Sequence, residues 1–427
     1  MFLNSIEGIH EAVKATNYYK SKGDKMKPVI IDKVNFFLNA INSGNLHHQD
    51  LFQFTPVPLH SKILRNMLGR YEAENIINIL QEMDIIQVNH SYEIGKESKK
   101  YGLTDNAKNF KYTPVGVLSE RMEKKILNYK NNLFNYYLKD KKIHSKIINN
   151  LTKLSFNPDN QKALTALNQN EKGTNKDKYY NNTYEALKEM NGYTSINQYI
   201  KCSNFYYTQS HKVNRVFHYF STIPKAFRES LTLKDGTLLA DLDLKNAQPL
   251  IMGLNYLKSK RWYTTSDKML LNDLLSGNFY NKIAEHAKNK GDLEFYNLFT
   301  NDYGEFKATV LGQGLYYHYV PLDIIKNAEK YLRELYPDFM KNLREKKRVT
   351  GYKSVSIEAQ QIEASIFIDG LFSQLDNDQF AVPVHDAVLV KSDEVEKFKI
   401  KLINIFRSKF TLLTHEQVQN LFRITYY

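Results

Sequence analysis

The chain has 427 residues, of which 42% are hydrophobic and 25% charged, so we expect two or three folded domains and exclude a wholly disordered protein. Its 59 lysines and arginines exceed its 46 aspartates and glutamates by 13, which favours a polyanionic partner such as nucleic acid. No apolar run reaches the ~20 residues of a membrane span, the N-terminus lacks a secretory signal, and the single cysteine excludes an intrachain disulfide framework. We therefore expect a cytoplasmic protein with no membrane partner.

Residues 61–104 have the pattern of a winged helix. Two helical segments, SKILRNMLG and YEAENIINILQEMD, precede the alternating strand IIQVNHSY, the basic turn EIGKESKK and the return strand KYGLT. In a winged helix, this turn is the wing and lies on a nucleic-acid backbone. A small α+β hairpin module without that role is the alternative.

The segment from about residue 116 to 200 has the pattern of amphipathic helices with Asn and Lys on their outer faces. Residues 111–180 hold 14 lysines and arginines against 6 aspartates and glutamates, which is 8 of the 13 net charges. A general basic bias from an AT-rich genome would not concentrate the charge in this way. After residue 201, short β-branched runs alternate with helices to the C-terminus.

The strongest chemical signal is the segment GTLLADLDLKNAQPLIMGL. Asp241 and Asp243 are two residues apart in a strand-like run, so both side chains leave the same face of the strand. Two carboxylates at the end of a buried strand are costly unless a cation neutralises them. Asn246 is a plausible cap for the helix that follows, with Pro249 in its first turn.

Two further segments carry candidate residues. FAVPVHDAVLVKS predicts a hairpin with His385 and Asp386 at its tip. NDYGEFKATVLGQGLYYHY places Lys307 on a helical segment with a glycine-rich end. Each of these motifs is weak when taken alone.

Together and in this order, the three segments resemble the palm and fingers of family A polymerases, the group that contains bacterial DNA polymerase I and the single-subunit phage RNA polymerases. The resemblance covers about residues 205–395. The segment with the two aspartates resembles motif A, KATVLG resembles the K-A-x-x-x-G core of motif B, and VHDAVLV resembles motif C. The positions that match the family's functional residues are Arg215, Arg228, Asp243, Gln248, Lys307, Gln361, His385 and Asp386.

The resemblance implies nucleotidyl transfer with two metal ions, Mg²⁺ or Mn²⁺. Asp243 and Asp386 would bridge both ions, and Leu244 would add its backbone carbonyl oxygen. Asp241 is either an additional metal-side acid or a supporting acid, and we favour the supporting role.

The resemblance also implies contacts with the substrates. Lys307 and Arg228 would hold the triphosphate of the incoming nucleotide, and Lys307 could protonate the leaving group. Gln248 would lie beside the nucleotide. The residues implied to contact the primer and template are Arg215, Gln361 and His385.

Several positions depart from the family pattern. Ala387 stands where the DNA polymerases have a third acid, Tyr303 stands where an arginine is common, and Leu315 and Tyr316 replace the Tyr-Gly pair that ends motif B. Gln248 replaces a glutamate that helps to close the space beside the sugar C2′. Its amide could donate a hydrogen bond to a 2′-hydroxyl, or it could remain a packed steric block, so we expect a weakened preference for deoxynucleotides.

The expected fold is α+β: a right-hand polymerase with an antiparallel palm sheet and helical fingers and thumb, preceded by a winged-helix-like domain. We expect the winged helix within residues 1–115, the thumb-like region within 116–204, and palm and fingers within 205–427, with the fingers at about 262–350.

The expected activity is that of a monomeric DNA polymerase without a proofreading exonuclease, from a phage, plasmid or mobile element and active in the bacterial cytosol. Its partners would be a DNA primer–template or single-stranded DNA template and nucleoside triphosphates. One alternative is a ribonucleotide-using polymerase or primase. The other is a winged-helix replication initiator whose polymerase-like half is inactive.

Trp262 is the single tryptophan of the chain and follows Lys260 and Arg261. An aromatic ring next to basic residues can stack on a base. Because tryptophan is highly buried on average, we expect a packed side chain here.

Overall fold

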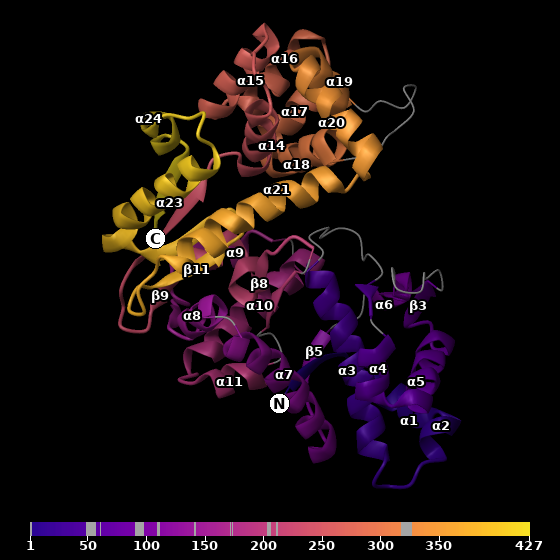
Figure 1. The fold of residues 1–427 in the computed structure, drawn as a ribbon. Coiled ribbons are helices and arrows are strands. Elements are labelled where there is room, and N and C mark those ends of the chain that lie inside the picture. Colours follow the sequence, from indigo (N-terminus) through magenta and orange to yellow (C-terminus); the bar gives the residue numbers. More distant parts are fainter. Residues whose placement is uncertain are drawn as a thin grey trace. The chain divides into compact units, whose positions relative to one another are not determined.

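The computed structural model describes residues 2–427 except 48–56, 60, 90–97, 109–111, 141, 171, 173, 203–205, 211 and 317–326. It is rich in helices and contains small antiparallel sheets, so the fold class is α+β as predicted (Figure 1). The chain divides into two compact units: Met1–Tyr207 with His218–Ser230, and Thr208–Phe217 with Leu231–Tyr427. The two domains expected within residues 1–204 both lie in the first unit, and the boundary between them stays a prediction.

The first unit begins with a module of helices around a three-stranded sheet. Two helices followed by two strands were predicted here, and α4, α5, β3 and β4 have that order; β2 and β3 both pair antiparallel with β4. Most of the predicted wing lies outside the described residues. The elements are β1 (Phe2–Ile6), α1 (Ile9–Ala15), α2 (Asn17–Lys20), α3 (Lys27–His47), β2 (Val57–Pro58), α4 (Ser61–Leu68), α5 (Arg70–Glu82), β3 (Ile86–Asn89), β4 (Lys100–Leu103), α6 (Asp105–Lys108) and β5 (Tyr112–Gly116).

Apolar residues at helical spacing build the core of this module. On α5, Ile76, Ile79 and Leu80 are buried, and on α3 the buried residues include Phe37 and Leu38. Residues three or four apart lie on one face of a helix, so both helices turn an apolar face to a single shared cluster.

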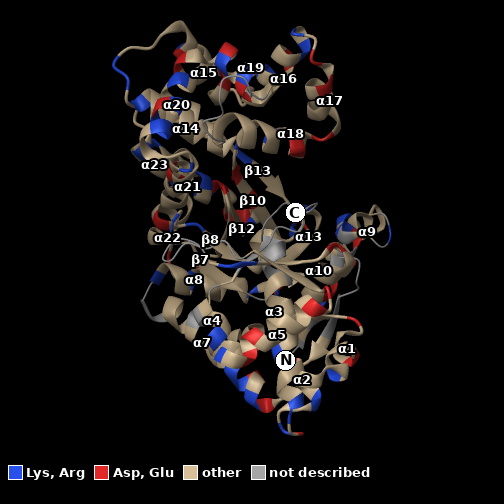
Figure 2. Ribbon diagram, turned by 90° about the vertical axis from the view of Figure 1, so that its right-hand side faces the viewer, with Lys and Arg blue, Asp and Glu red and all other residues tan. Residues whose placement is uncertain are grey.

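Helices fill most of the rest of the first unit, as expected for residues 116–200. Figure 2 shows lysines and arginines along α7 with acidic residues among them. The elements are α7 (Glu120–Asp140), α8 (Lys142–Leu151), β6 (Leu154–Phe156), α9 (Gln161–Asn168), α10 (Asn175–Asn191), α11 (Ile196–Lys201), α12 (Tyr219–Thr222) and α13 (Lys225–Arg228).

The second unit is built on a four-stranded antiparallel sheet with the order β11-β12-β10-β13. Its strands are β10 (Leu239–Leu244), β11 (Ala381–Val384), β12 (Ala387–Lys391) and β13 (Phe422–Tyr426), preceded in the chain by the short β7 (Tyr207–Gln209), β8 (Val216–His218) and β9 (Leu231–Leu233). Nearly every residue of β10, β11 and β12 is buried. A strand covered on both faces must be apolar along its whole length, which is why the aspartates of β10 stand out.

Between β10 and β11 the chain forms a helical region. Its elements are α14 (Ala247–Lys258), α15 (Thr265–Leu275), α16 (Phe279–Asn289), α17 (Leu293–Asn301), α18 (Tyr303–Thr309), the π-helix η1 (Val310–Tyr316), α19 (Asn327–Leu335), α20 (Pro337–Thr350) and α21 (Ser354–Ala364). A Cβ atom at Gly253 would lie 2.3 Å from a methyl carbon of Leu274, so glycine allows α14 to approach α15 closely.

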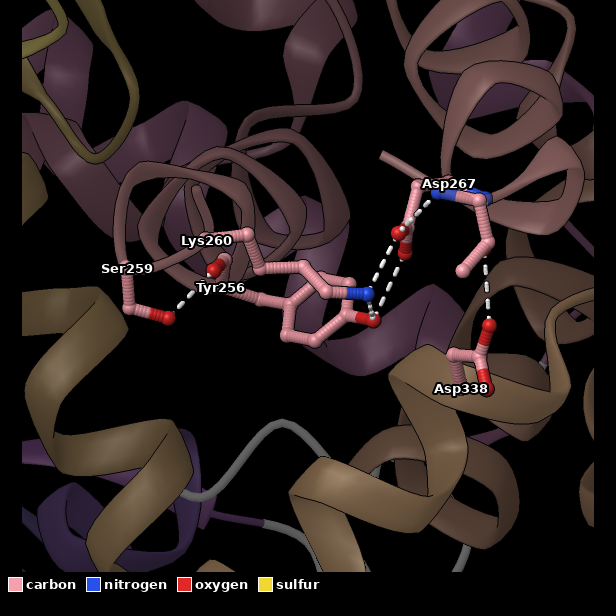
Figure 3. A network of polar contacts seen from close by, with 6 residues as sticks. Tyr256, Ser259, Lys260, Asp267 and Asp338 are labelled. Carbon is pink, nitrogen blue, oxygen red and sulfur yellow. Dashed lines mark hydrogen bonds and ion pairs between the residues drawn. The ribbon is translucent and has the colours of Figure 1, made fainter. Parts of the chain in front are cut away.

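A buried polar network joins three of these helices (Figure 3). The Asp267 carboxylate on α15 accepts hydrogen bonds from the Tyr256 hydroxyl at 2.6 Å, from Lys260, and from the backbone N–H of Thr264 at 2.8 Å. Thr264 caps α15 and donates its hydroxyl to Asp338 on α20 at 2.8 Å. The network therefore holds the ends of α14 and α15 against α20.

The chain returns to the sheet through a long helical stretch. After α21 it continues as the π-helix η3 (Ser365–Gly370) and α22 (Leu371–Ser373), and after β12 as η4 (Ser392–Glu394), α23 (Val395–Lys409) and α24 (His415–Gln419). Helix α23 packs on β10 and β12. Among the described residues, no helix combines the length and apolarity needed to cross a membrane.

The predicted packing of Trp262 is wrong. Its side chain is 86% exposed in the connection between α14 and α15. It follows the buried helix α14 in the sequence, but the residue of this connection that bonds to Asp267 is Lys260.

Candidate active site

The sheet of the second unit brings two of the predicted acids together. Asp243 on β10 lies directly opposite Ala387 on β12. Asp386 immediately precedes Ala387, in the tight turn that joins β11 to β12, where a hairpin tip was predicted. The backbone N–H of Leu244 donates to the carbonyl oxygen of Asp386 at 3.1 Å. Two motifs far apart in the sequence thus meet at one end of the sheet (Figure 2).

The charges around these acids do not balance them. Burial raises the pKa of Asp243, the nearby Asp386 carboxylate raises it further, and Arg423 and Lys307 oppose both effects only in part. Burial also raises the pKa of Asp386, against the effects of its own backbone N–H and of the cations Arg215 and Lys307. A pair of carboxylates with raised pKa values favours a cation, because a cation between them removes their repulsion.

Lys307 is a cation that acts on both acids. It lies on α18, and its ammonium nitrogen is 5.5 Å from the ring centroids of both Tyr280 and Tyr303. Aromatic faces attract an ammonium group without neutralising its charge. That charge lowers the pKa of both Asp243 and Asp386. Tyr303, a departure from the family pattern, therefore helps to hold the predicted lysine.

Gln248 is held by a chain of hydrogen bonds. The Tyr316 hydroxyl donates to Gln248 Oε1 at 2.9 Å, and Gln248 Nε2 donates to the carboxylate of Glu363. The same Glu363 oxygen accepts a hydrogen bond from Arg215 Nη2 at 2.6 Å. Leu315 is buried. On the π-helix η1, Tyr316 is therefore the residue that contacts Gln248.

Glu363 is a member of this group that the sequence analysis missed. It is fully buried on α21, and burial raises its pKa to about 7, although Arg215 lowers it. Its Oε1 atom has no hydrogen-bond partner among the described residues. The available signal was an acid in the run QQIEASIFI, where Ala364 and Ile366 beside it are buried, because a buried acid requires a donor or a cation.

The C-terminal strand supplies two more partners that were not predicted. Arg423 lies opposite Asp243 on β13, and its Nη2 is 2.5 Å from the Asp243 carboxylate. The Tyr427 hydroxyl donates to the buried carboxylate of Asp241 at 2.6 Å. This contact favours the supporting role for Asp241. The alternation in FRITY predicts a strand, but it does not show that this strand pairs with β10.

Backbone strain is concentrated near the same residues. His385 has φ of 54° and directly precedes Asp386; Asn246 has φ of 50° where α14 begins. Residues other than glycine rarely adopt this left-handed backbone region, and those that do cluster at functional sites. In the described part of the chain, the non-glycine residues with positive φ are Asp84, Asn214, Asn246 and His385.

Two predicted residues are placed away from this group or in the other unit. Gln361 is exposed on α21, and its amide donates to the backbone carbonyl oxygen of Lys212 at 2.7 Å. Arg228 ends α13 in the first unit. Their contacts with template and triphosphate stay predictions, as does the contact of His385 with the primer.

The donor set at the sheet fits Mg²⁺. This ion binds one or two carboxylates and completes its octahedral shell with water and phosphate oxygens, and Asp243 and Asp386 are two adjacent acids whose mutual repulsion it would relieve. No group of three or more His, Cys, Asp or Glu suited to a metal occurs in the described ranges. Substrate phosphates and water would therefore have to supply much of the shell.

Neither a scan against models of known protein families nor a search of curated proteins finds a match to this chain. The functional interpretation rests on the residues and on their geometry.

Proposed function

We propose that the protein is a template-dependent nucleotidyltransferase, a DNA polymerase similar to those of family A. The observation that carries the proposal is the meeting of Asp243, Asp386 and Lys307. These residues come from three motifs that were matched by sequence order alone, and in the fold their charges act on one another.

The proposed architecture follows from this site. The sheet β11-β12-β10-β13 would be the palm, and the helices from α15 to α20 would be the fingers. In the first unit, the module around α4 and α5 would be a winged-helix-like DNA-binding domain, and the basic helices from α7 to α11 a thumb-like region. The partners would be a DNA primer–template, or a single-stranded DNA template, and nucleoside triphosphates. We expect the protein to act as a monomer.

In the reaction, the primer 3′-oxygen attacks the α-phosphorus, and the bond from that phosphorus to the β-phosphate oxygen breaks. Two Mg²⁺ or Mn²⁺ ions, when bound, would lower the pKa of the 3′-hydroxyl and neutralise charge on the leaving pyrophosphate. Asp243 and Asp386 would hold them, together with the Leu244 carbonyl oxygen. Lys307, which lies beside two tyrosine rings, would bind a triphosphate oxygen and give its proton to the leaving group. Arg228 would add a second cation for the triphosphate.

Arg423 would neutralise Asp243 while no metal is present. Its side chain is 58% exposed, against 22% for Asp243. Because it lies mostly in solvent, the guanidinium can leave Asp243 without opening a buried cavity. We therefore expect Arg423 to be an exchangeable counter-ion at this site.

Gln248 and Tyr316 would lie beside the sugar of the incoming nucleotide. The Tyr316 hydroxyl donates a hydrogen bond to Gln248 Oε1, and Glu363 accepts a hydrogen bond from one of the two N–H groups of Gln248 Nε2. This fixed amide supports the role of a steric block. Its second N–H can still donate to a 2′-hydroxyl. That donor favours a second candidate function, a polymerase or primase that uses ribonucleotides.

The test is extension of DNA and RNA primers on DNA and RNA templates, with Mg²⁺ and either deoxynucleotides or ribonucleotides. We expect extension of a DNA primer on DNA, with deoxynucleotides preferred. Preferred use of ribonucleotides, or synthesis without a primer, would support the second candidate. Binding of DNA with no incorporation by the wild type, under Mg²⁺ or Mn²⁺, would overturn both and favour a replication initiator.

A further inference from the structure

The connection between α14 and α15 is held firmly at both ends (Figure 3). At its start, the Ser259 hydroxyl donates to the Tyr256 carbonyl oxygen at 2.7 Å, and Lys260 donates to the Tyr256 hydroxyl at 2.7 Å and to Asp267. At its end, Thr264 is bonded to Asp267 and to Asp338. The residues between these anchors, Arg261 to Tyr263, are therefore presented on a fixed support.

This support holds a tryptophan in solvent. At 86%, Trp262 has the largest exposed fraction among the exposed large hydrophobic side chains of the described residues. A tryptophan that could fold back would gain stability, because burying its large apolar surface is favourable. The bonds of Lys260 and Thr264 hold the chain on either side of Trp262, and its indole ring is accessible to solvent.

The charge beside the ring is positive. The stretch KSKRWYT contains three basic residues and no acid. Lys260 is paired with Asp267 and the Lys258 ammonium donates to the Lys409 carbonyl oxygen, whereas Arg261 is exposed and has no ion pair among the described residues. An unpaired guanidinium next to an exposed ring suits a ligand that has both a flat π-face and a negative charge.

We propose that Trp262 and Arg261 form a contact site for single-stranded nucleic acid, in which a base stacks on the indole ring and Arg261 binds the adjoining phosphate. A protein partner fits less well. Met269 is 39% exposed, but the exposed neighbours Thr264, Thr265 and Lys268 are polar, and an apolar interface would have to remove them from water. The site lies outside the proposed catalytic group and requires neither metal nor catalysis.

The chain contains one tryptophan, so emission excited at wavelengths where its 30 tyrosines do not absorb reports on this ring alone. The experiment uses the full chain without divalent metal or nucleotide, titrated with single-stranded oligodeoxyuridylate or oligouridylate, which carry the same base on different sugars. Binding is followed at the same time by the anisotropy of a label on the oligonucleotide. We expect saturable quenching of Trp262 that follows the anisotropy. Equal effects of both oligonucleotides would show that the site does not read the sugar, and quenching by only one would assign it to DNA or RNA.

Variants separate stacking from charge. Trp262→Ala should weaken binding by about ten- to a hundredfold, the range expected for the loss of one stacked base, and Trp262→Phe should retain most of the affinity. Arg261→Gln should flatten the salt dependence by about 0.7 in slope, the amount for one phosphate on a single strand. The matched control is Val349→Ala, because Val349 is also exposed, at 68%, and also follows an arginine. It should bind as the wild type does.

Several results would overturn the proposal. One is unchanged Trp262 fluorescence when the anisotropy shows the oligonucleotide to be bound. Another is equal affinity of Trp262→Ala and Val349→Ala. A fluorescence change that depends only on protein concentration, or that an oligonucleotide of abasic sites produces equally well, would also contradict base stacking and would indicate a second copy of the chain or a phosphate contact alone. Failure of primer extension leaves this test unaffected.

Discussion

The acids of the second unit that we compare differ in the direction of their pKa shifts. Asp267 accepts hydrogen bonds from Lys260, Tyr256 and the backbone of Thr264; these outweigh burial, and the pKa of Asp267 is lowered. Asp243 and Asp386 are also withdrawn from solvent, but burial and their mutual repulsion exceed the effect of the nearby cations, and both pKa values are raised.

The difference separates a structural acid from a functional one. The donors around Asp267 are Tyr256 on α14, Lys260 in the connection and the backbone of Thr264 at the start of α15, so their loss would loosen the fold. The cations that act on Asp243 and Asp386 are Arg423, Lys307 and Arg215. Arg423 is 58% exposed, so it can leave Asp243 when a ligand arrives. A shifted pKa alone does not distinguish the groups. The direction of the shift and the kind of partner do.

The largest expected effect concerns catalysis. Asp243→Asn or Asp386→Asn should reduce nucleotide incorporation on the order of a thousandfold, because each removes a negative ligand worth several kcal/mol in the transition state. Either change should leave stability unchanged or slightly increased, because it removes charge repulsion. Single-turnover incorporation and urea unfolding of the same preparations measure both quantities. A variant that is less stable than the wild type but keeps its activity would show that these acids have a structural role, as Asp267 has.

At Asp267, the structural acid, we expect the opposite: a loss of stability without a loss of activity. Asp267→Ala should lower the free energy of unfolding by about 4 kcal/mol, because it leaves Lys260 without its buried partner and removes a cap from α15. Asp267→Asn, which keeps the shape and some of the hydrogen bonds, should cost less. Incorporation per folded molecule should stay near that of the wild type. A large loss of activity in a variant that remains folded would contradict the assignment.

Glu363 should give stability a pH dependence opposite to that of Asp267. Its pKa is about 7 in the fold against an ordinary value of 4.5, so between these values the folded state holds a proton that the unfolded state has released. Stability therefore falls as the pH rises from 4.5 to 7, by about 3 kcal/mol. Asp267, with a lowered pKa, contributes stability above its ordinary value of 3.8 that is lost on acidification.

The measurement is urea unfolding of wild type and Glu363→Gln across this pH range. Asp243 and Asp386 also have raised pKa values and contribute to the pH dependence of both proteins. The effect of Glu363 is therefore read from the difference in free energy of unfolding between wild type and variant. As the pH rises, the free energy of unfolding of Glu363→Gln should increase relative to that of the wild type. If the free energies of unfolding of the two proteins changed in parallel with pH, Glu363 would be ionised over the whole range.

The smallest effect concerns the choice of sugar. Gln248→Glu alone would set two carboxylates against each other, and Glu363→Gln alone would remove the charge that Arg215 pairs with. A glutamate stands at the position of Gln248 in the family pattern, but here it would lie against Glu363, so we expect each single change to weaken the preference for deoxynucleotides by about tenfold, or 1.4 kcal/mol. The double variant restores one carboxylate and one amide and should recover most of the preference. Additive losses in the double variant would show that the two residues do not act together.

The parts of this site that the sequence predicted are those with a local pattern. The strand around Asp243, the hairpin tip at Asp386 and the helix of Lys307 each follow from periodicity and turn residues within a short segment. The structural acid also had a local signal, since Thr264 and Asp267 have the spacing of a capping box.

The partners of these residues could not be predicted, because they depend on pairing between distant segments. Arg423 reaches Asp243 only because β13 joins the edge of β10. Glu363 reaches Gln248 only because α21 packs against α14. Trp262 is exposed in a connection whose other residues bond to α15 and α20. Long-range contacts of this kind leave no periodic trace in a single sequence.

The most direct test of the account is binding of Mn²⁺ to the free protein, measured by the loss of the paramagnetic signal of the free ion. The account predicts that the wild type binds Mn²⁺, that the double variant Asp243→Asn/Asp386→Asn does not at the same concentrations, and that Asp267→Asn binds as the wild type does. Undiminished Mn²⁺ binding by the double variant would contradict it.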